Sequence, residues 1–203
     1  MPQVLESPSA IGQRPATPAI LSPARLAHVV MRTSQFDALV AWYLTVLGAK
    51  VAFSDGALAF LSYDEEHHRI AVLNIPGLQR QPDGMTGVHH IAFTYGRLGD
   101  LVATYERLAA ENIRPVTCIN HGPTTSMYYA DPDGNQVELQ VDNYDTVEEA
   151  GEFFYSPAFA INPIGVDFEP SDLARRFHAG EEEASIKKRP DSGARGLDTL
   201  NLR

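Results

Sequence analysis

The sequence has little cysteine, a shortage of positive charge and no long apolar run. Cys118 is the only cysteine in 203 residues, so no disulfide can form within the chain. A lone thiol without metal-type cysteine spacing is most often a small buried apolar residue. Sixteen Lys and Arg stand against 26 Asp and Glu, which gives a formal charge of −10. Such a surface repels phosphate backbones and anionic lipid, so we expect neither nucleic acid nor a membrane as a partner.

The apolar stretches are broken by proline or charge well before the roughly 18–20 residues that a membrane-spanning helix needs. The N-terminus has no basic segment that leads into an apolar one. We therefore expect a cytoplasmic protein. A content of 44% hydrophobic and 21% charged residues is that of a globular domain, which excludes disorder of the whole chain. Histidine is the informative residue type, because six of the seven histidines fall between positions 28 and 121.

The two ends of the chain differ in composition from its middle. Residues 1–23 hold five of the 14 prolines, which indicates an extended N-terminal arm. Residues 179–203 contain EEE and KKRP and no aromatic residue, which favours a disordered tail. Between the core and this tail, residues 146–178 carry an acidic amphipathic stretch and a helical pattern. We interpret that segment as an appendage to a core at residues 24–145.

The core contains an internal repeat with an offset of 62 residues. This offset places His28 on His90 and aligns the pattern LVAxY at 39–43 with the same pattern at 101–105. Each copy begins with a β-type run, continues with an apolar pattern of helical period, and then enters three further strand-like runs. We predict an α+β fold of two tandem βαβββ modules, at about 24–78 and 86–145. Their open sheet faces would form a curved, mixed-sheet, barrel-like metal cleft.

The sequence patterns place the elements of the two modules. The predicted strands of the first module span 26–33, 49–54, 57–63 and 68–75, and those of the second span 88–95, 115–120, 125–130 and 135–141. The predicted helices span 36–48 and 98–113. The sequence DPDG at 131–134 predicts a tight hairpin turn, because proline presets φ and glycine accepts the positive φ of such turns.

The repeat also selects candidate metal ligands. His89 and His90 are adjacent on a predicted strand and should point to opposite faces, and the register pairs His28 with His90. Equivalent residues of two pseudo-symmetric modules can meet at a shared cleft, so these two imidazoles could reach one metal. Glu138 lies between apolar residues, where a buried carboxylate is costly unless it is paired or bound. Two imidazoles and one carboxylate suit non-haem Fe(II). Taken singly, a strand histidine is more often a core or rim residue, and a strand glutamate is often solvated.

The order of these motifs resembles a known superfamily. The segments AHVVMRTSQFDALVAWYLTVLGAKV, HHRIAVLNI, VHHIAFTYGRLGDLVATYERL and NHGPTTSMYYADPDGNQVELQV are similar to the vicinal oxygen chelate superfamily. This superfamily joins glyoxalases, bleomycin-resistance proteins and extradiol dioxygenases. Within it the chain resembles the type I extradiol catechol dioxygenases, and among them the 2,3-dihydroxybiphenyl 1,2-dioxygenases, over about residues 24–145. The resemblance implies Fe(II), less often Mn(II), held by His28, His90 and Glu138.

The resemblance also implies catalytic roles for three further residues. His68 matches a histidine that moves protons and steadies the bound oxygen species, although its polar neighbours alone are typical of an exposed strand start. His121 matches a histidine that hydrogen-bonds an oxygen of the substrate; by itself it would be a loop residue before a Gly-Pro turn. Counting back from Glu138 selects Tyr128 over Tyr129 as the tyrosine that donates a hydrogen bond to the bound diol. The ordinary alternative is a strand tyrosine packed in the sheet.

The chain departs from the family pattern at the expected mouth of the site. The loop between His121 and Tyr128 is shorter than usual, and the stretch 76–87 is longer. The N-terminal domain of the two-domain enzymes is missing, so we expect a one-domain member. These departures bear on the choice of substrate more than on the metal.

The expected function is ring cleavage of a catechol-type diol, such as a 2,3-dihydroxybiphenyl, by insertion of O₂. The expected partners are this small aromatic diol, O₂ and further copies of the chain in a homo-oligomer. One alternative is a non-oxidative, glyoxalase-like lyase or isomerase, which has no need of His68, His121 and Tyr128 together. Another is a binding protein that sequesters a small molecule, a class that typically lacks the three metal ligands.

Overall fold

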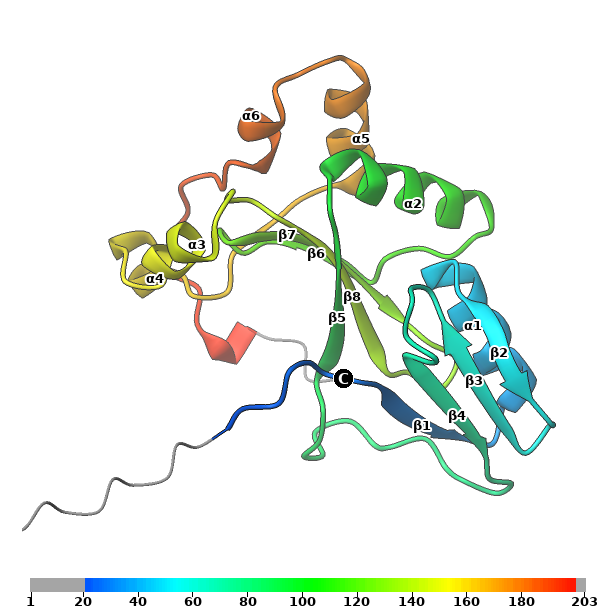
Figure 1. Cartoon of the computed structure of the whole chain (residues 1–203). Helices are drawn as coiled ribbons and strands as arrows, with labels where there is room; N and C mark the ends of the chain where they lie inside the picture. The colour runs from blue at the N-terminus through cyan, green and yellow to red at the C-terminus, as the bar shows by residue number, and fades with distance from the viewer. Residues whose placement is uncertain (1–20, 200–203) are drawn as a thin grey trace, which may run out of the picture.

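The computed structural model describes residues 21–199, which form two βαβββ modules and a mainly helical C-terminal segment (Figure 1). The first module contains β1 (Val29–Thr33), α1 (Phe36–Leu47), β2 (Lys50–Ser54), β3 (Leu58–Ser62) and β4 (Ile70–Asn74). The second contains β5 (His90–Tyr95), α2 (Leu98–Ala110), β6 (Thr117–Asn120), β7 (Thr124–Ala130) and β8 (Gln136–Asp142). The predicted α+β fold of two tandem modules is confirmed. Most of the predicted N-terminal arm, residues 1–23, lies outside the described residues.

Each module forms one mixed sheet, and the two sheets share a topology. The strand order is β1-β4-β3-β2 in the first and β5-β8-β7-β6-β9 in the second, where β9 (Val166–Asp167) comes from the C-terminal segment. The first strand of each module runs parallel to its fourth, and the remaining neighbours run antiparallel. The 62-residue offset carries α1 onto residues 98–109, and α2 is observed at Leu98–Ala110. The repeat in the sequence is therefore a repeat in the structure.

The two module helices form because each has an apolar stripe of helical period. In α1 the buried Leu39, Tyr43 and Val46 lie on one face, and the helix ends at Gly48, whose φ of +62° suits a residue without a Cβ. In α2 the buried side chains follow the same spacing. At 13 residues α2 is the longest described helix, and none between residues 21 and 199 is long and apolar enough to cross a membrane.

A single apolar core joins the two modules. It combines buried side chains of both helices with those of β3, β4, β7 and β8. Hydrogen bonds cross between the modules at its margin: the buried Tyr43 hydroxyl donates to Asp131 Oδ2 over 3.3 Å, and Arg107 Nη1 donates to the Thr45 carbonyl over 2.7 Å. The helix-covered sides of the two modules are thus packed into one unit.

The two sheets do not close into a barrel and leave the predicted cleft open (Figure 1). The described strands β1 and β5 belong to separate sheets and form no ladder with each other. The physical reason is the position of the common core, which lies on the helix-covered sides. The opposite face of each sheet therefore stays open, as β1 shows: Val30 is 48% exposed, whereas Val29 and Met31 pack against the core.

The C-terminal segment, residues 146–199, packs against the core more closely than the predicted appendage and disordered tail. It contains α3 (Val147–Phe153), α4 (Pro157–Ile161), α5 (Pro170–His178), α6 (Glu183–Lys187) and a 3₁₀ turn at Leu197–Thr199. Helix α5 packs on α2, and Leu173 joins the common core. Within the predicted disordered tail, Ile186 is buried in that core, and the Lys187 carbonyl accepts a hydrogen bond from Asn120. These local contacts fix a stretch whose composition alone favours disorder.

Candidate active site

Four of the six predicted site residues gather on the open face of the second sheet. His90 begins β5, and Glu138 lies mid-strand in the neighbouring β8. The ladder pairs Ala92 with Glu138, so His90, two residues before Ala92, shares the face of the carboxylate. Tyr128 of β7 pairs directly with Glu138, and His121 follows the end of β6. Strand register therefore assembles this cluster.

The side chains of this cluster are in direct contact. The distance from His90 Nε2 to Glu138 Oε2 is 2.9 Å, and the distance from His121 Nε2 to the Tyr128 hydroxyl is 2.8 Å. The His90 and Tyr128 rings lie nearly perpendicular, with centroids 5.3 Å apart. Glu138 is 4% exposed and Tyr128 is 5% exposed. The Glu138 carboxylate is thus buried in contact with the His90 imidazole and next to the Tyr128 phenol.

The surroundings set the protonation state of each group. Burial raises the pKa of Glu138, but hydrogen bonds from His90 and Ser126 and the nearby imidazoles outweigh it, so the net pKa is lowered. Burial lowers the pKa of His121 despite the opposing effect of Glu138. Burial, reinforced by the charge of Glu138, raises the pKa of Tyr128. At neutral pH the site therefore presents a carboxylate, a neutral imidazole and a protonated phenol.

The hydrogen bonds of His121 determine its tautomer. Its Nδ1 bonds to the backbone carbonyl of Ile164, and a carbonyl can only accept. Nδ1 therefore carries the proton, and Nε2 of the neutral ring accepts the hydrogen bond of the Tyr128 hydroxyl. The role of Ile164 was not predictable from the sequence, because a backbone acceptor 43 residues away leaves no mark in a motif.

A turn in the C-terminal segment holds the Ile164 carbonyl in place. Asn162 Oδ1 accepts from the backbone N–H groups of Ile164 and Gly165 over 3.1 and 2.7 Å. Asn162 Nδ2 donates to the Ser192 hydroxyl over 2.8 Å. Arg189 donates to the carbonyls of His121 and Asn162 over 3.2 and 2.8 Å. Gly165 has φ +119°, and a Cβ there would lie 2.5 Å from the Asn120 carbonyl oxygen, so the turn requires glycine.

The remaining two predicted site residues, His28 and His68, lie on the first sheet. His28 directly precedes β1 and is exposed, and His68 shortly precedes β4 and is buried. Their ring centroids are 4.3 Å apart, and His68 stacks on Phe60 at 4.4 Å. Burial, together with the proximity of His28 and His67, lowers the pKa of His68. A neutral, buried imidazole therefore stands beside an exposed one.

The structure divides the predicted metal ligands between the two sheets. Between residues 21 and 199, no three His, Cys, Asp or Glu side chains converge on a position where they could hold one metal ion. His90 and Glu138 are together, and His28 lies apart with His68. The donors of the second sheet fit a divalent cation, because an ionised carboxylate beside imidazole nitrogen is the type of set that Fe(II) and Mn(II) accept. The joint role of His28, His90 and Glu138 remains a prediction.

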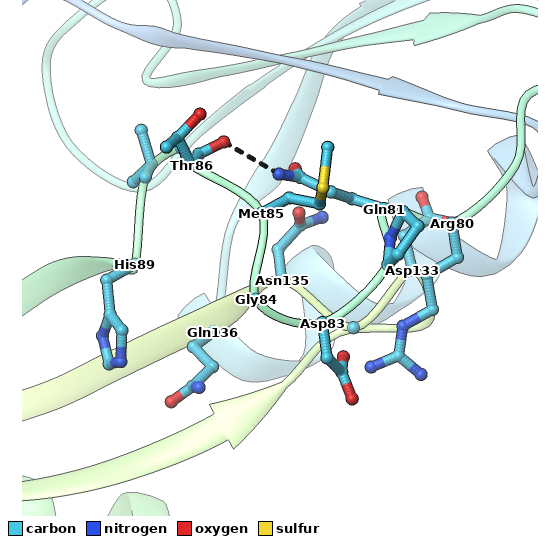
Figure 2. A pocket seen from close by; sticks show the side chains of 14 residues that line it. Arg80, Gln81, Asp83, Gly84, Met85, Thr86, His89, Asp133, Asn135 and Gln136 are labelled. Atoms are coloured by element: carbon cyan, nitrogen blue, oxygen red, sulfur yellow. Dashed lines mark hydrogen bonds between the residues drawn. The ribbon is translucent and has the colours of Figure 1, made fainter. Parts of the chain in front are cut away.

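The His89 side chain does not follow the alternation of faces that is expected along a strand. Its Nδ1 lies 2.8 Å from His90 Nδ1, and the ring centroids are 5.0 Å apart. The strand begins at His90, so strand alternation does not force His89 onto the opposite face. Figure 2 shows His89 at one side of a cavity of about 290 Å³, formed by the loop at 80–88 and the turn at 133–136.

A larger cavity of about 660 Å³ lies between β1 and β5. Val30 and Arg32 line it from the first module, and His90 and Ala92 line it from the second. Its volume is in the range of small-molecule sites. The face of His90 is therefore accessible from a space that could hold an aromatic ligand.

Comparison with known proteins identifies relatives. The family model of the Glyoxalase/Bleomycin resistance protein/Dioxygenase superfamily matches residues 25–139. The chain is 46% identical over 157 residues to biphenyl-2,3-diol 1,2-dioxygenase 2 of Rhodococcus globerulus, covering 77% of this chain and 83% of that protein. It is 43% identical over 167 residues to biphenyl-2,3-diol 1,2-dioxygenase 3 of the same organism, covering 81% and 88%.

A solved structure shows the same fold. A glyoxylase/bleomycin resistance protein/dioxygenase domain from Frankia sp. EAN1pec superposes with a TM-score of 0.51 at 18% identity, covering 62% of this chain and 96% of that one. The C-terminal turn that holds His121 lies beyond the residues matched by the family model.

Proposed function

This chain belongs to the glyoxalase/bleomycin resistance protein/dioxygenase superfamily, and we propose that it cleaves a biphenyl-2,3-diol-like catechol with O₂ at an Fe(II) site of His28, His90 and Glu138. It is an extradiol dioxygenase, in keeping with its 43–46% identity to two biphenyl-2,3-diol dioxygenases. The observation that carries the site assignment is the buried carboxylate of Glu138, 2.9 Å from His90 and next to a protonated phenol and a neutral imidazole.

The proposed site needs a metal ion in addition to the protein's own side chains. When bound, Fe(II), or Mn(II) in its place, would lower the pKa of a chelated diol hydroxyl and offer positions for both the diol and O₂. Glu138 and His90 supply two donors already in contact, and His28 supplies the third. The lowered pKa of Glu138 keeps its carboxylate ionised for this purpose.

The chain's own side chains bind and orient the diol. Tyr128 keeps its proton, because burial and Glu138 raise its pKa, and on substrate binding its hydrogen bond passes from His121 Nε2 to a substrate oxygen. His121 presents an unprotonated Nε2, which accepts a proton or a hydrogen bond from a second substrate hydroxyl. Holding both oxygens fixes the ring geometry, which lowers the entropic barrier of the reaction.

We assign proton transfer to His68, which lies beside His28 at the first sheet. Its buried, neutral imidazole lies against Phe60, an apolar surface that excludes water. A neutral imidazole can take a proton from the substrate and return it later, so this residue serves as general base and then general acid. The cavity of about 660 Å³ beside His90 gives an aromatic diol room to enter.

We further propose that the protein works in the cytoplasm as a homo-oligomer, with an aromatic diol and O₂ as its small-molecule partners. The net charge of −10 supports the absence of nucleic acid and membrane partners.

The test is anaerobic reconstitution with Fe(II), followed by 2,3-dihydroxybiphenyl, catechol or 3-methylcatechol in air. We expect oxygen uptake and a yellow ring-cleavage product, with the biphenyl diol as the best substrate. Conversion of a diol without consumption of oxygen would instead favour a non-oxidative, glyoxalase-like reaction. Protein that holds stoichiometric iron, yet consumes no oxygen with all three diols, would refute the proposal.

A further inference from the structure

Two arginines at the large cavity are set apart from most arginines of the chain. Within residues 21–199, most arginines form an ion pair with an acidic side chain or donate to a backbone carbonyl. Arg32, Arg80 and Arg114 do neither in that range. Arg32 and Arg80 both line the cavity of about 660 Å³ beside His90. Positive charge without a partner is therefore concentrated next to the proposed catalytic centre.

The cavity has an excess of positive charge, although the chain as a whole is acidic. Apart from histidines, its charged lining residues are Arg32, Arg80 and Asp133, whereas the whole chain carries a formal charge of −10. Asp133 Oδ1 accepts a hydrogen bond from Gln35 Nε2 over 2.8 Å, and the described residues show no ion pair between Asp133 and either arginine. A hollow lined by one sign of charge attracts ligands of the opposite sign.

The DPDG turn supports the Arg80 side chain without neutralising it. Gly134 has φ +85°, and a Cβ there would lie 2.5 Å from Arg80 Cζ, so the guanidinium lies directly on the turn. Figure 2 shows this guanidinium beside the turn, with no dashed line to Asp83 or Asp133. A planar guanidinium that keeps its N–H groups for a ligand matches a carboxylate through two parallel hydrogen bonds.

Arg32 reaches the same cavity from the first module. It lies two residues after Val30 on β1, so the two side chains share the open face of the sheet, whereas Val29 and Met31 pack against the core. Val30 is 48% exposed and also lines the cavity. The cavity therefore combines an apolar side chain, suited to an aromatic ring, with one arginine from each module.

The cavity has room for more than a catechol ring. Its volume of about 660 Å³ is typical of sites for drug-sized ligands. It adjoins the cavity of about 290 Å³, since Arg80 and His89 line both, whereas His90 lines only the larger one. Arg80 belongs to the stretch 76–87, which is longer than is usual in the family. A side chain on the ring can therefore extend from the diol site at His90 toward this loop.

We infer that Arg32 and Arg80 bind a carboxylate on the side chain of the diol, so that the substrate class is catechols with an anionic side chain. The inference rests on the proposed function, because it extends the same site. The hydroxyls of the diol lie at His90 and Glu138, and the carboxylate accepts hydrogen bonds from the two guanidinium groups. An uncharged ring, as in a biphenyl diol, still fills the apolar part of the cavity but leaves both arginines without a partner.

The first measurement compares two diols that differ in charge, 3-(2,3-dihydroxyphenyl)propanoate and its methyl ester, with the Fe(II)-loaded protein. Because charge-assisted hydrogen bonds are roughly twice as strong as neutral ones, we expect kcat/KM to be about 10-fold higher for the acid, mainly through a lower KM. Equal kcat/KM for the two diols would overturn the inference and leave the proposed function intact. Iron-loaded protein that cleaves neither of them, nor 2,3-dihydroxybiphenyl, would instead refute the proposed function.

The second measurement repeats the comparison with Arg32→Gln and Arg80→Gln. We expect the ratio of kcat/KM for the acid to that for the ester to fall toward one in both variants, because glutamine carries no charge. Arg80→Lys should give an intermediate ratio, since lysine keeps the charge but not the planar fork. The matched control is Arg114→Gln, an exposed arginine that lines neither cavity, and it should keep the wild-type ratio. A wild-type ratio in either cavity variant, with folding verified by circular dichroism, would overturn the inference.

The third measurement needs neither metal nor turnover. Ligand-observed NMR compares the binding of 3-phenylpropanoate and of the uncharged 3-phenylpropanamide to the metal-free protein. We expect the anion to bind more tightly, and the difference to be lost in Arg80→Gln. Equal affinities in the wild type, or a difference that persists in Arg80→Gln, would overturn the inference. If the protein prefers the anion but its iron-loaded form cleaves no diol, the carboxylate subsite stands and the proposed function is refuted.

Discussion

Asn162 links the C-terminal segment to His121, the proposed substrate-binding histidine, so its replacement by alanine tests whether that segment serves the site. Its side chain accepts from the N–H groups of Ile164 and Gly165 and donates to Ser192. The turn that it shapes presents the Ile164 carbonyl to His121 Nδ1. Alanine leaves two buried N–H groups without their acceptor and frees the carbonyl from its position.

The size of the effect follows from the bonds that are lost. Buried hydrogen bonds of this kind contribute about 1 kcal/mol each, and a buried donor without a partner costs about 1–3 kcal/mol. For the Asn162→Ala variant we therefore expect a loss of about 2–4 kcal/mol in the free energy of unfolding. In a protein of this size each kcal/mol lowers Tm by about 2–4 °C, so Tm should fall by about 4–16 °C.

The catalytic effect should exceed the effect of lower stability. When the Ile164 carbonyl is no longer held in place, the His121 ring can turn or exchange tautomers. Misplacement of a catalytic group lowers the reaction rate by about 10- to 100-fold. We expect kcat/KM for the diol to fall by that factor at a temperature where the variant is fully folded. The matched control is Asn74→Ala, which removes one exposed side-chain bond, to the Gly56 carbonyl, and should leave kcat/KM unchanged. A variant with lowered Tm but wild-type kcat/KM would refute the positioning of His121 by this segment.

Three further predictions concern single side chains. Tyr128→Phe should lower kcat/KM about 100-fold through loss of a hydrogen-bond donor. Tyr129→Phe should preserve kcat/KM, because that buried hydroxyl has no hydrogen-bond partner within residues 21–199. Steady-state kinetics of both variants tests this, and equal losses would contradict the choice of Tyr128. Burial raises the pKa of Cys118 to about 12. Ellman's reagent at about pH 8 should therefore label the native protein very slowly and the urea-unfolded chain fully. Rapid labelling of the native protein would contradict the burial of Cys118. Leu139→Ala empties part of the common core and should lower the free energy of unfolding by about 2–5 kcal/mol in urea titration, and a loss below about 1 kcal/mol would contradict the packing.

Local pattern made much of the fold predictable. The 62-residue repeat located both helices, because an apolar stripe of helical period survives in each copy. The resemblance to the family named Glu138 and Tyr128, and the strand register of the structure pairs them directly. Tyr128 contacts His121 and Tyr129 lies in the common core, and the catalytic role of Tyr128 stays a prediction.

Features that depend on packing between distant segments were not predictable. The separation of His28 from His90 arises because the two modules share a core on their helix-covered sides, and a repeat alone cannot show which faces meet. The hold on His121 comes from a backbone carbonyl at Ile164, which no side-chain motif reveals. Composition favoured disorder in the tail, yet one apolar residue, Ile186, anchors it to the core.

We propose that this chain cleaves a catechol ring with O₂ at a metal bound by His28, His90 and Glu138. The most direct measurement is oxygen consumption by the Fe(II)-loaded protein, set against the amount of 2,3-dihydroxybiphenyl cleaved. We predict one O₂ consumed for each diol, a yellow product, and loss of both Fe(II) and oxygen uptake in Glu138→Gln. Stoichiometric iron without oxygen uptake in the wild type, or full activity in Glu138→Gln, would contradict this proposal.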